Sequence, residues 1–242
     1  MIPLADGNPT QRTAVVTILI IIACAAVYFF VQPTPTATTR ADALFNYEHA
    51  LVPLEVRTGS PLTNCELAAQ LCGATTAQTP IFPGKHVYLA LVVSMFLHGS
   101  LIHLAGNMLF LWIFGNNIED RLGRIAFPIF YAVAGLVAAG GYVIVNPSST
   151  VPLVGASGAI AGVMGAYLVW FPRARVVTLI GFIPLPLPAW VMLAVWFVLQ
   201  FFTGPDSAVA WVAHVAGFVF GVAVALLLRE RGGLRPRRTL PV

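Results

Sequence analysis

Four polar side chains stand inside the long apolar stretches of this 242-residue sequence: Ser157, His214, His103 and Asn107. A serine hydroxyl is a poor nucleophile until an adjacent imidazole accepts its proton, and His214 is the natural base for Ser157. Acyl transfer also needs hydrogen-bond donors for the oxyanion, which His103, Asn107 and the Ser157 backbone N–H can supply. The residue types therefore predict a serine hydrolase site built on a Ser-His dyad.

The composition indicates where such a site must lie. Hydrophobic residues make up 58% of the chain and charged residues only 9%, whereas a soluble domain carries roughly a quarter charged residues. A surface facing water cannot be covered with so few charges. We therefore expect an all-α integral membrane protein with one domain.

Six apolar stretches approach the roughly 20 residues that a helix needs to span a bilayer. They lie at about residues 13–31, 100–117, 125–145, 153–171, 176–199 and 208–228. The connection 32–86 is too polar to span. The sequence thus predicts a six-helix membrane domain over residues 13–228, preceded by a short segment, 1–12, and followed by a basic tail, 229–242.

The distribution of basic residues predicts the orientation, because Lys and Arg favour the cytoplasmic side. With six spans, one face receives Arg12, Arg121, Arg124, Arg173, Arg175 and the tail, and the other receives Arg40, Arg57 and Lys85, all in the long loop. Both termini are therefore predicted to be cytoplasmic and the loop 32–86 to be extracytoplasmic. The membrane itself is taken to be a bacterial plasma membrane. The net charge of +4 indicates topology, not a nucleic-acid partner. For the tail, contact with anionic lipid head groups is the alternative to a plain cytoplasmic extension.

The helices that carry the four polar residues all run inward from the extracytoplasmic side. Each residue falls a few positions past the outer end of its helix, which places all four within about 5–10 Å of that boundary. His103 and Asn107 are four residues apart and share one helix face. Small residues at the same spacing, such as Gly158 and Gly162, predict that the fourth and sixth helices touch.

Four segments of the sequence resemble motifs of the rhomboid intramembrane proteases. Residues 155–158 resemble the GxSG motif, residues 103–107 the HxxxN motif, residues 213–221 the AHxxGxxxG motif, and residues 115–123 the stretch that closes the second helix, where a Glu and an Arg help to hold the cytoplasmic loop. The resemblance runs from about Val87 to Leu228, with the motifs in the right order and spacing.

By this resemblance Ser157 would be the nucleophile, His214 its base, and His103 with Asn107 the oxyanion donors. The residues that it would assign to structural roles are Gly155, Gly158, Gly217, Gly221, Glu119 and Arg121. The family cleaves transmembrane substrates near their extracytoplasmic ends, so the expected partners are membrane protein substrates and the lipid bilayer. No cofactor, metal or nucleic acid is expected.

Two positions depart from the family's pattern. Some members carry a Trp-Arg pair in the first loop, where Leu89 and Ala90 stand here. Some have an aromatic ring four residues after the serine that stacks on the catalytic histidine, and Ala161 takes that place. The only acidic residue near the outer end of the sixth helix is Asp206, which we expect in a solvated loop. What orients His214 is therefore left open.

The three cysteines fall into two groups. Cys24 lies in the first apolar stretch, where we expect a buried apolar side chain. Cys65 and Cys72 both lie in the long loop, in a compartment predicted to be oxidising. They form either a disulfide or a pair of free thiols.

Two other function classes stay open. A non-catalytic relative that escorts membrane proteins is one, although such relatives usually lack the serine or the histidine. A transporter is the other, since intramembrane His and Asn can line a pathway, but the sequence has no obvious internal repeat and no mid-span carboxylate. Zinc and aspartyl intramembrane proteases are excluded, because HExxH and a pair of intramembrane aspartates are both absent.

Overall fold

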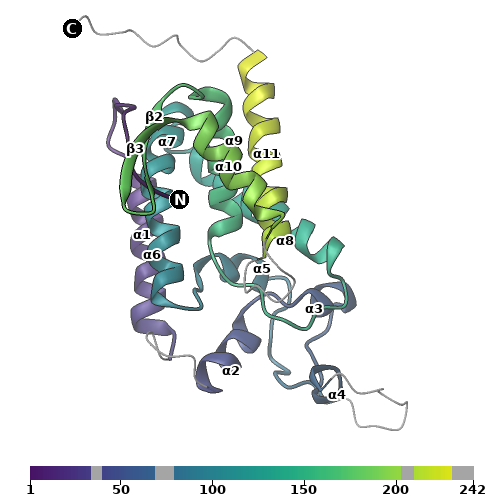
Figure 1. Cartoon of the computed structure of the whole chain (residues 1–242). Helices are drawn as coiled ribbons and strands as arrows, with labels where there is room; N and C mark the ends of the chain where they lie inside the picture. The colour runs from purple at the N-terminus through teal and green to yellow at the C-terminus, as the bar shows by residue number, and fades with distance from the viewer. Residues whose placement is uncertain (34–39, 69–78, 203–209, 231–242) are drawn as a thin grey trace, which may run out of the picture.

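The computed structural model describes residues 1–33, 40–68, 79–202 and 210–230, and these are mostly helical (Figure 1). The α-helices are α1 (Val15–Ala26), α2 (Arg40–His49), α3 (Pro53–Thr58), α4 (Asn64–Leu67), α5 (Ala90–Val93), α6 (Leu101–Phe110), α7 (Asn116–Leu122), α8 (Ala126–Val145), α9 (Ser157–Trp170), α10 (Ala189–Gln200) and α11 (Trp211–Glu230). The π-helical segments Val27–Val31 and Leu111–Gly115 extend α1 and join α6 to α7, and the 3₁₀ segment Ser94–Phe96 follows α5. The strands are β1 (Ile2–Asp6), β2 (Arg175–Ile180) and β3 (Ile183–Pro188).

Three helical runs are long and apolar enough to cross a membrane, namely Leu101–Leu122, Ala126–Val145 and Trp211–Leu228. Three apolar helices are shorter, namely Val15–Val31, Ser157–Trp170 and Ala189–Gln200. The described chain is thus a mostly helical membrane protein, as the composition predicts. Ala208, where the sixth span was expected to begin, and residues 231–242 of the tail lie outside the described residues.

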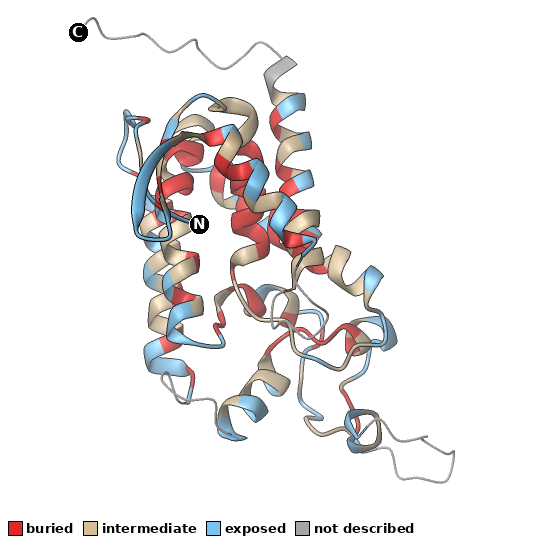
Figure 2. Ribbon diagram, viewed as in Figure 1, coloured by how far each residue is buried: buried red, intermediate tan, exposed pale blue. Residues whose placement is uncertain are grey.

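The core is centred on α9, most of whose residues are buried (Figure 2). Its closest partner is α11, and α8 packs against both helices. A Cβ atom at Gly217 would collide with the backbone carbonyl of Gly158, and one at Gly221 would collide with that of Gly162. The predicted contact between the fourth and sixth helices is therefore confirmed, and small residues make it possible.

The expected helix over residues 176–199 is wrong in its first half. Residues 176–188 belong to a β2–β3 hairpin, and α10 begins only at Ala189. Three prolines alternate along β3, at 184, 186 and 188, and Pro both removes a helical hydrogen bond and clashes with the preceding turn. Gly181 in the hairpin turn has a φ of 61°, which suits glycine. An apolar run that looked like a helix is therefore a hairpin followed by a short helix.

The N-terminal residues complete a small antiparallel sheet, with strand order β1-β2-β3. Ile2 pairs with Leu179 and Asp6 with Val176. The Asp6 carboxylate accepts hydrogen bonds from Asn117 Nδ2 and Tyr167 Oη, both at 2.7 Å, which ties the sheet to α7 and α9. The expectation of an all-α protein is thus wrong for this sheet. Its strands β1 and β2 pair although they lie far apart in the sequence.

The long connection after α1, residues 32–86, contains α2, α3 and α4. These short helices lie at one end of the molecule (Figure 1). A buried ion pair joins Lys85 Nζ to Glu55 Oε2 at 2.5 Å. Burial lowers the pKa of Lys85, and the Glu55 carboxylate opposes that shift. Cys65 is disulfide-bonded, whereas Cys72 lies outside the described residues and Cys24 is a buried free thiol, as expected.

Candidate active site

Ser157 is the first residue of α9, and the turn that delivers it depends on Gly155. The φ of Gly155 is 124°, a value that other residues rarely adopt. Its N–H donates to the Ser94 carbonyl at 2.9 Å, which fixes the turn against the 3₁₀ segment Ser94–Phe96. A Cβ atom at Gly155 would lie 2.9 Å from His103 Nε2 and 3.6 Å from Ser157 Oγ. Because glycine has no side chain, the space between the His103 imidazole and the Ser157 hydroxyl stays open.

His214, in the first turn of α11, meets Ser157 directly. Its Nε2 lies 2.8 Å from Ser157 Oγ. Its Nδ1 lies 2.7 Å from Gln200 Oε1. An amide oxygen only accepts hydrogen bonds, so Nδ1 carries the proton and the Nε2 lone pair faces the hydroxyl. This is the tautomer that a general base requires.

Gln200 is the residue that sequence reasoning missed. It ends α10 and is buried, and its Nε2 donates to the Trp196 carbonyl at 3.1 Å. The Trp196 indole also lies beside the imidazole, with 5.8 Å between the His214 and Trp196 ring centroids. An amide at the end of an apolar stretch was the available signal, because polar groups at membrane depth are costly. Asp206, the acidic residue weighed instead, lies outside the described residues.

His103 and Asn107 project from α6 toward the same space. Ser100 caps this helix by accepting from the His103 backbone N–H at 3.1 Å. His103 Nδ1 faces the Gly99 N–H at 3.4 Å, so Nε2 is the donor nitrogen on the side of Ser157. Asn107 Nδ2 donates one hydrogen to the His103 carbonyl at 3.0 Å, and its second hydrogen remains for another acceptor. Two side-chain donors therefore line the same cavity as the Ser157 hydroxyl.

The backbone at the start of α9 adds a third donor. The first helical hydrogen bond runs from Ile160 N–H to the Ala156 carbonyl at 3.0 Å, so the Ser157 N–H precedes the ladder. Amides at a helix N-terminus carry partial positive charge, which favours a developing oxyanion.

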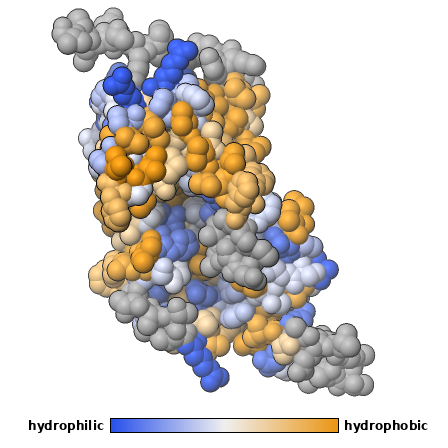
Figure 3. Space-filling model, viewed as in Figure 1, coloured by the Kyte–Doolittle hydropathy of each residue, from blue (hydrophilic) through white to orange (hydrophobic). Residues whose placement is uncertain are grey.

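A cavity of about 690 Å³ joins these groups. It is lined by Ser157, His214, His103, Asn107, Trp196, Tyr142 and apolar residues from α6, α9 and the segment 151–154. Figure 3 shows hydrophilic side chains in a hollow between the apolar band over β2, β3 and α10 and the layer of the long connection. The structure thus brings all four predicted site residues into one cavity.

His98, for which no role is predicted from the sequence, lies behind His103. The two rings meet edge to face at a centroid distance of 5.3 Å. Gln32 holds the His98 backbone on both sides, accepting from its N–H and donating to its carbonyl at 3.0 Å. Burial, with a smaller contribution from His103, lowers the pKa of His98 to about 4. A neutral His98 therefore packs under the oxyanion side of the site.

Glu119 and Arg121 lie away from the cavity. The Glu119 carboxylate accepts from the Val16 and Thr17 backbone N–H groups at 2.9 and 2.7 Å and from the Thr17 hydroxyl at 2.8 Å. It thereby caps the start of α1. The Arg121 guanidinium stacks over Trp170, 4.8 Å from the ring centroid, at the end of α9.

No group of three or more His, Cys, Asp or Glu side chains suited to hold a metal ion occurs among the described residues.

Comparison with known proteins gives a match between residues 85–231 and the rhomboid domain. Rhomboid protein 1, mitochondrial, of Saccharomyces cerevisiae is 32% identical over 148 residues, which cover 55% of this chain and 40% of the relative. The putative rhomboid protease YdcA of Bacillus subtilis is 36% identical over 78 residues, or 32% of this chain and 39% of the relative. Rhomboid protease GlpG of Yersinia pestis is 28% identical over 130 residues, or 54% and 44%. The matched segments span less than half of these relatives.

Proposed function

This chain belongs to the rhomboid family of intramembrane serine proteases, and from that premise we propose that it is an active endopeptidase. Its substrates are membrane proteins, cut in or near the extracytoplasmic ends of their transmembrane segments. The observation that carries the proposal is the 2.8 Å contact between His214 Nε2 and Ser157 Oγ inside a cavity that His103 and Asn107 also line.

The proposed mechanism follows from the atoms that face one another. As Ser157 Oγ attacks the scissile carbonyl carbon, its proton passes to His214 Nε2. The carbonyl oxygen becomes an oxyanion and accepts hydrogen bonds from His103, Asn107 and the Ser157 N–H. The imidazolium then protonates the leaving amine, and the C–N bond breaks to leave an acyl-serine. Water, deprotonated by His214, hydrolyses that ester and regenerates the hydroxyl.

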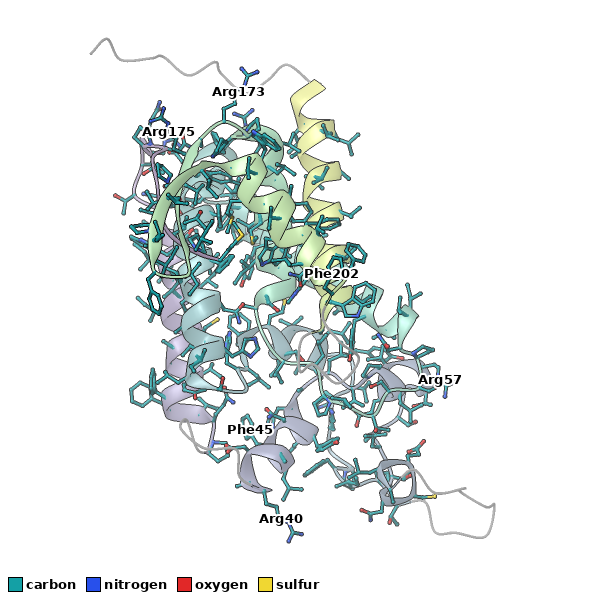
Figure 4. All side chains as sticks on the ribbon, in the orientation of Figure 1. Arg40, Phe45, Arg57, Arg173, Arg175 and Phe202 are labelled. Atoms are coloured by element: carbon teal, nitrogen blue, oxygen red, sulfur yellow. The ribbon has the colours of Figure 1, made fainter. Side chains whose placement is uncertain are left out.

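We also propose that all six apolar helices cross the membrane, with residues 1–12 and 229–242 on the cytoplasmic side of a bacterial plasma membrane. Figure 4 supports this orientation, because Arg173 and Arg175 lie at one end of the molecule and Arg40 and Arg57 at the other. Basic residues in short loops favour the cytoplasmic side. The site then opens toward the extracytoplasmic end, where the folded connection 40–68 lies.

Reconstituted protein tests the activity. Wild type in liposomes should cleave a model single-pass substrate, with the cut mapped by mass spectrometry to the extracytoplasmic end of its transmembrane segment. Ser157→Ala should yield no product. Ser148→Ala, an exposed serine in the segment before α9, should cleave like wild type. A wild-type protein that binds substrates without cleaving any would instead favour the escort function.

A further inference from the structure

We infer that Gln200 is a positioning residue for His214, so that the site works as a hydrogen-bonded Ser157-His214-Gln200 triad. This inference rests on the proposed protease function and deepens it. Gln200 would orient the His214 imidazole in this chain, in which Ala161 stands where some family members carry an aromatic ring that stacks on the histidine.

Both ring nitrogens of His214 are engaged, and the two contacts are short. Nε2 lies 2.8 Å from Ser157 Oγ and Nδ1 lies 2.7 Å from Gln200 Oε1. Without the second contact, nothing described would select between the two neutral tautomers, and the Nε2–H form cannot accept the serine proton. Gln200 therefore sets both the tautomer and the rotation of the ring.

The orientation of the Gln200 amide is itself determined. Its Nε2 donates to the Trp196 carbonyl at 3.1 Å, and a carbonyl can only accept. The amide oxygen, and not the amide nitrogen, must therefore face His214. Because Gln200 is only 7% exposed, water competes little for either contact.

The choice of an amide over a carboxylate suits a site at membrane depth. A buried carboxylate costs much more desolvation free energy than a neutral amide. The amide also gives less stabilisation to the imidazolium than a carboxylate would, so its main effect is to orient His214. Trp196, whose indole lies beside the imidazole, comes from the same helix, and α10 thus supplies support that Ala161 cannot.

Steady-state cleavage in liposomes tests this role with three variants. Gln200→Leu removes the acceptor and should lower kcat by about 10- to 100-fold with KM changed less than about twofold, because general-base catalysis needs the correct tautomer. Gln200→Glu restores an acceptor and should recover most of kcat. Its carboxylate favours the imidazolium, so the acidic limb of the pH–kcat profile should move to higher pH. Leu199→Ala, an exposed neighbour on α10, should match wild type.

A readout that does not depend on activity keeps the inference testable if a variant turns over slowly. In ¹⁵N-histidine NMR of folded protein, wild-type His214 should be the Nδ1–H tautomer, and Gln200→Leu should show a mixture. The inference is overturned if Gln200→Leu keeps wild-type kcat and tautomer. It is equally overturned if Gln200→Glu loses as much kcat as Gln200→Leu with no change in the pH profile. An inactive wild type, in contrast, would count against the protease function and leave the NMR result to decide the hydrogen bond.

Discussion

At its first residue, α9 presents Ser157 to a cavity of about 690 Å³ lined by polar groups from α6 and α11. Along the same helix, Gly162 meets the backbone of Gly221, and the last residue, Trp170, is covered by Arg121. One end of the helix is thus open and chemically equipped, and the rest is closely packed. Because interiors at full packing density resist any added atom, the packed part can hold the fold while the open end leaves room for a substrate. Substitutions should therefore separate into those that change stability and those that change activity.

The largest loss of stability should come from adding a side-chain atom where the glycines of α9 and α11 meet. Gly221→Ala places a Cβ against the Gly162 backbone, where neither main chain can yield locally. We expect a loss of about 3 kcal/mol or more in the free energy of unfolding, measured by denaturation in detergent. Gly140→Ala in α8, where an added Cβ would meet nothing within 4 Å, is the matched control. Equal stability of the two variants would contradict the close approach of α9 and α11.

Removing the Glu119 cap on α1 should lower the free energy of unfolding somewhat less than Gly221→Ala does. Glu119→Ala leaves two backbone N–H groups and the Thr17 hydroxyl without their acceptor, which should cost about 2–3 kcal/mol of unfolding free energy. Activity per folded molecule should stay at the wild-type value, since Glu119 does not line the cavity. Asp120→Ala removes only a more exposed contact with the Gln11 N–H and should cost far less. If activity fell in parallel with Glu119→Ala, the separation between the two regions would fail.

The opposite pattern is expected at the open end. Asn107→Ala removes a candidate oxyanion donor and should lower kcat by about 10²-fold, while the melting temperature stays close to that of wild type. Ala105→Ser, an exposed position on the same helix, controls for changes in α6. A large loss of stability with unchanged kcat would assign Asn107 to packing instead.

The smallest effect is on the pH dependence of stability, through His98, which packs under the site. The pKa of His98 is about 4 in the folded protein, against about 6.5 in the unfolded chain. The unfolded state therefore binds more protons between these values, and stability falls as pH falls. From pH 6.5 to 5.5 this group should account for a loss of about 1 kcal/mol in unfolding free energy. His98→Asn should reduce the slope over that range, and an unchanged slope would show that His98 stays accessible to protons.

Much of the site could be predicted because its residues are rare in apolar surroundings. Ser157, His214, His103 and Asn107 stood out as polar groups at similar depth, and the structure places them around one cavity. Gln200 was missed for a geometric reason: the expected fifth helix covered residues 176–199, whereas the hairpin takes 176–188 and α10 then ends at Gln200. With the helix misplaced, its last residue could not be aimed at His214.

The fold shows the same limit. Hydropathy predicts helices well where the apolar run is uninterrupted, as in Ala126–Val145. Small residues indicated the contact between α9 and α11, but other contacts between distant parts of the chain follow from no local pattern. The pairing of Ile2 with Leu179, and the bond between Thr17 and Glu119, join residues more than a hundred positions apart. Only the packed structure brings such partners together.

The most direct test of the proposed activity is active-site labelling of detergent-purified protein with a fluorophosphonate probe. A working dyad should give one covalent adduct, mapped by peptide mass spectrometry to Ser157, that is absent in Ser157→Ala and abolished in His214→Ala. Wild-type protein that is folded yet acquires no adduct, or His214→Ala labelled at the wild-type rate, would contradict the claim that Ser157 and His214 form a working dyad.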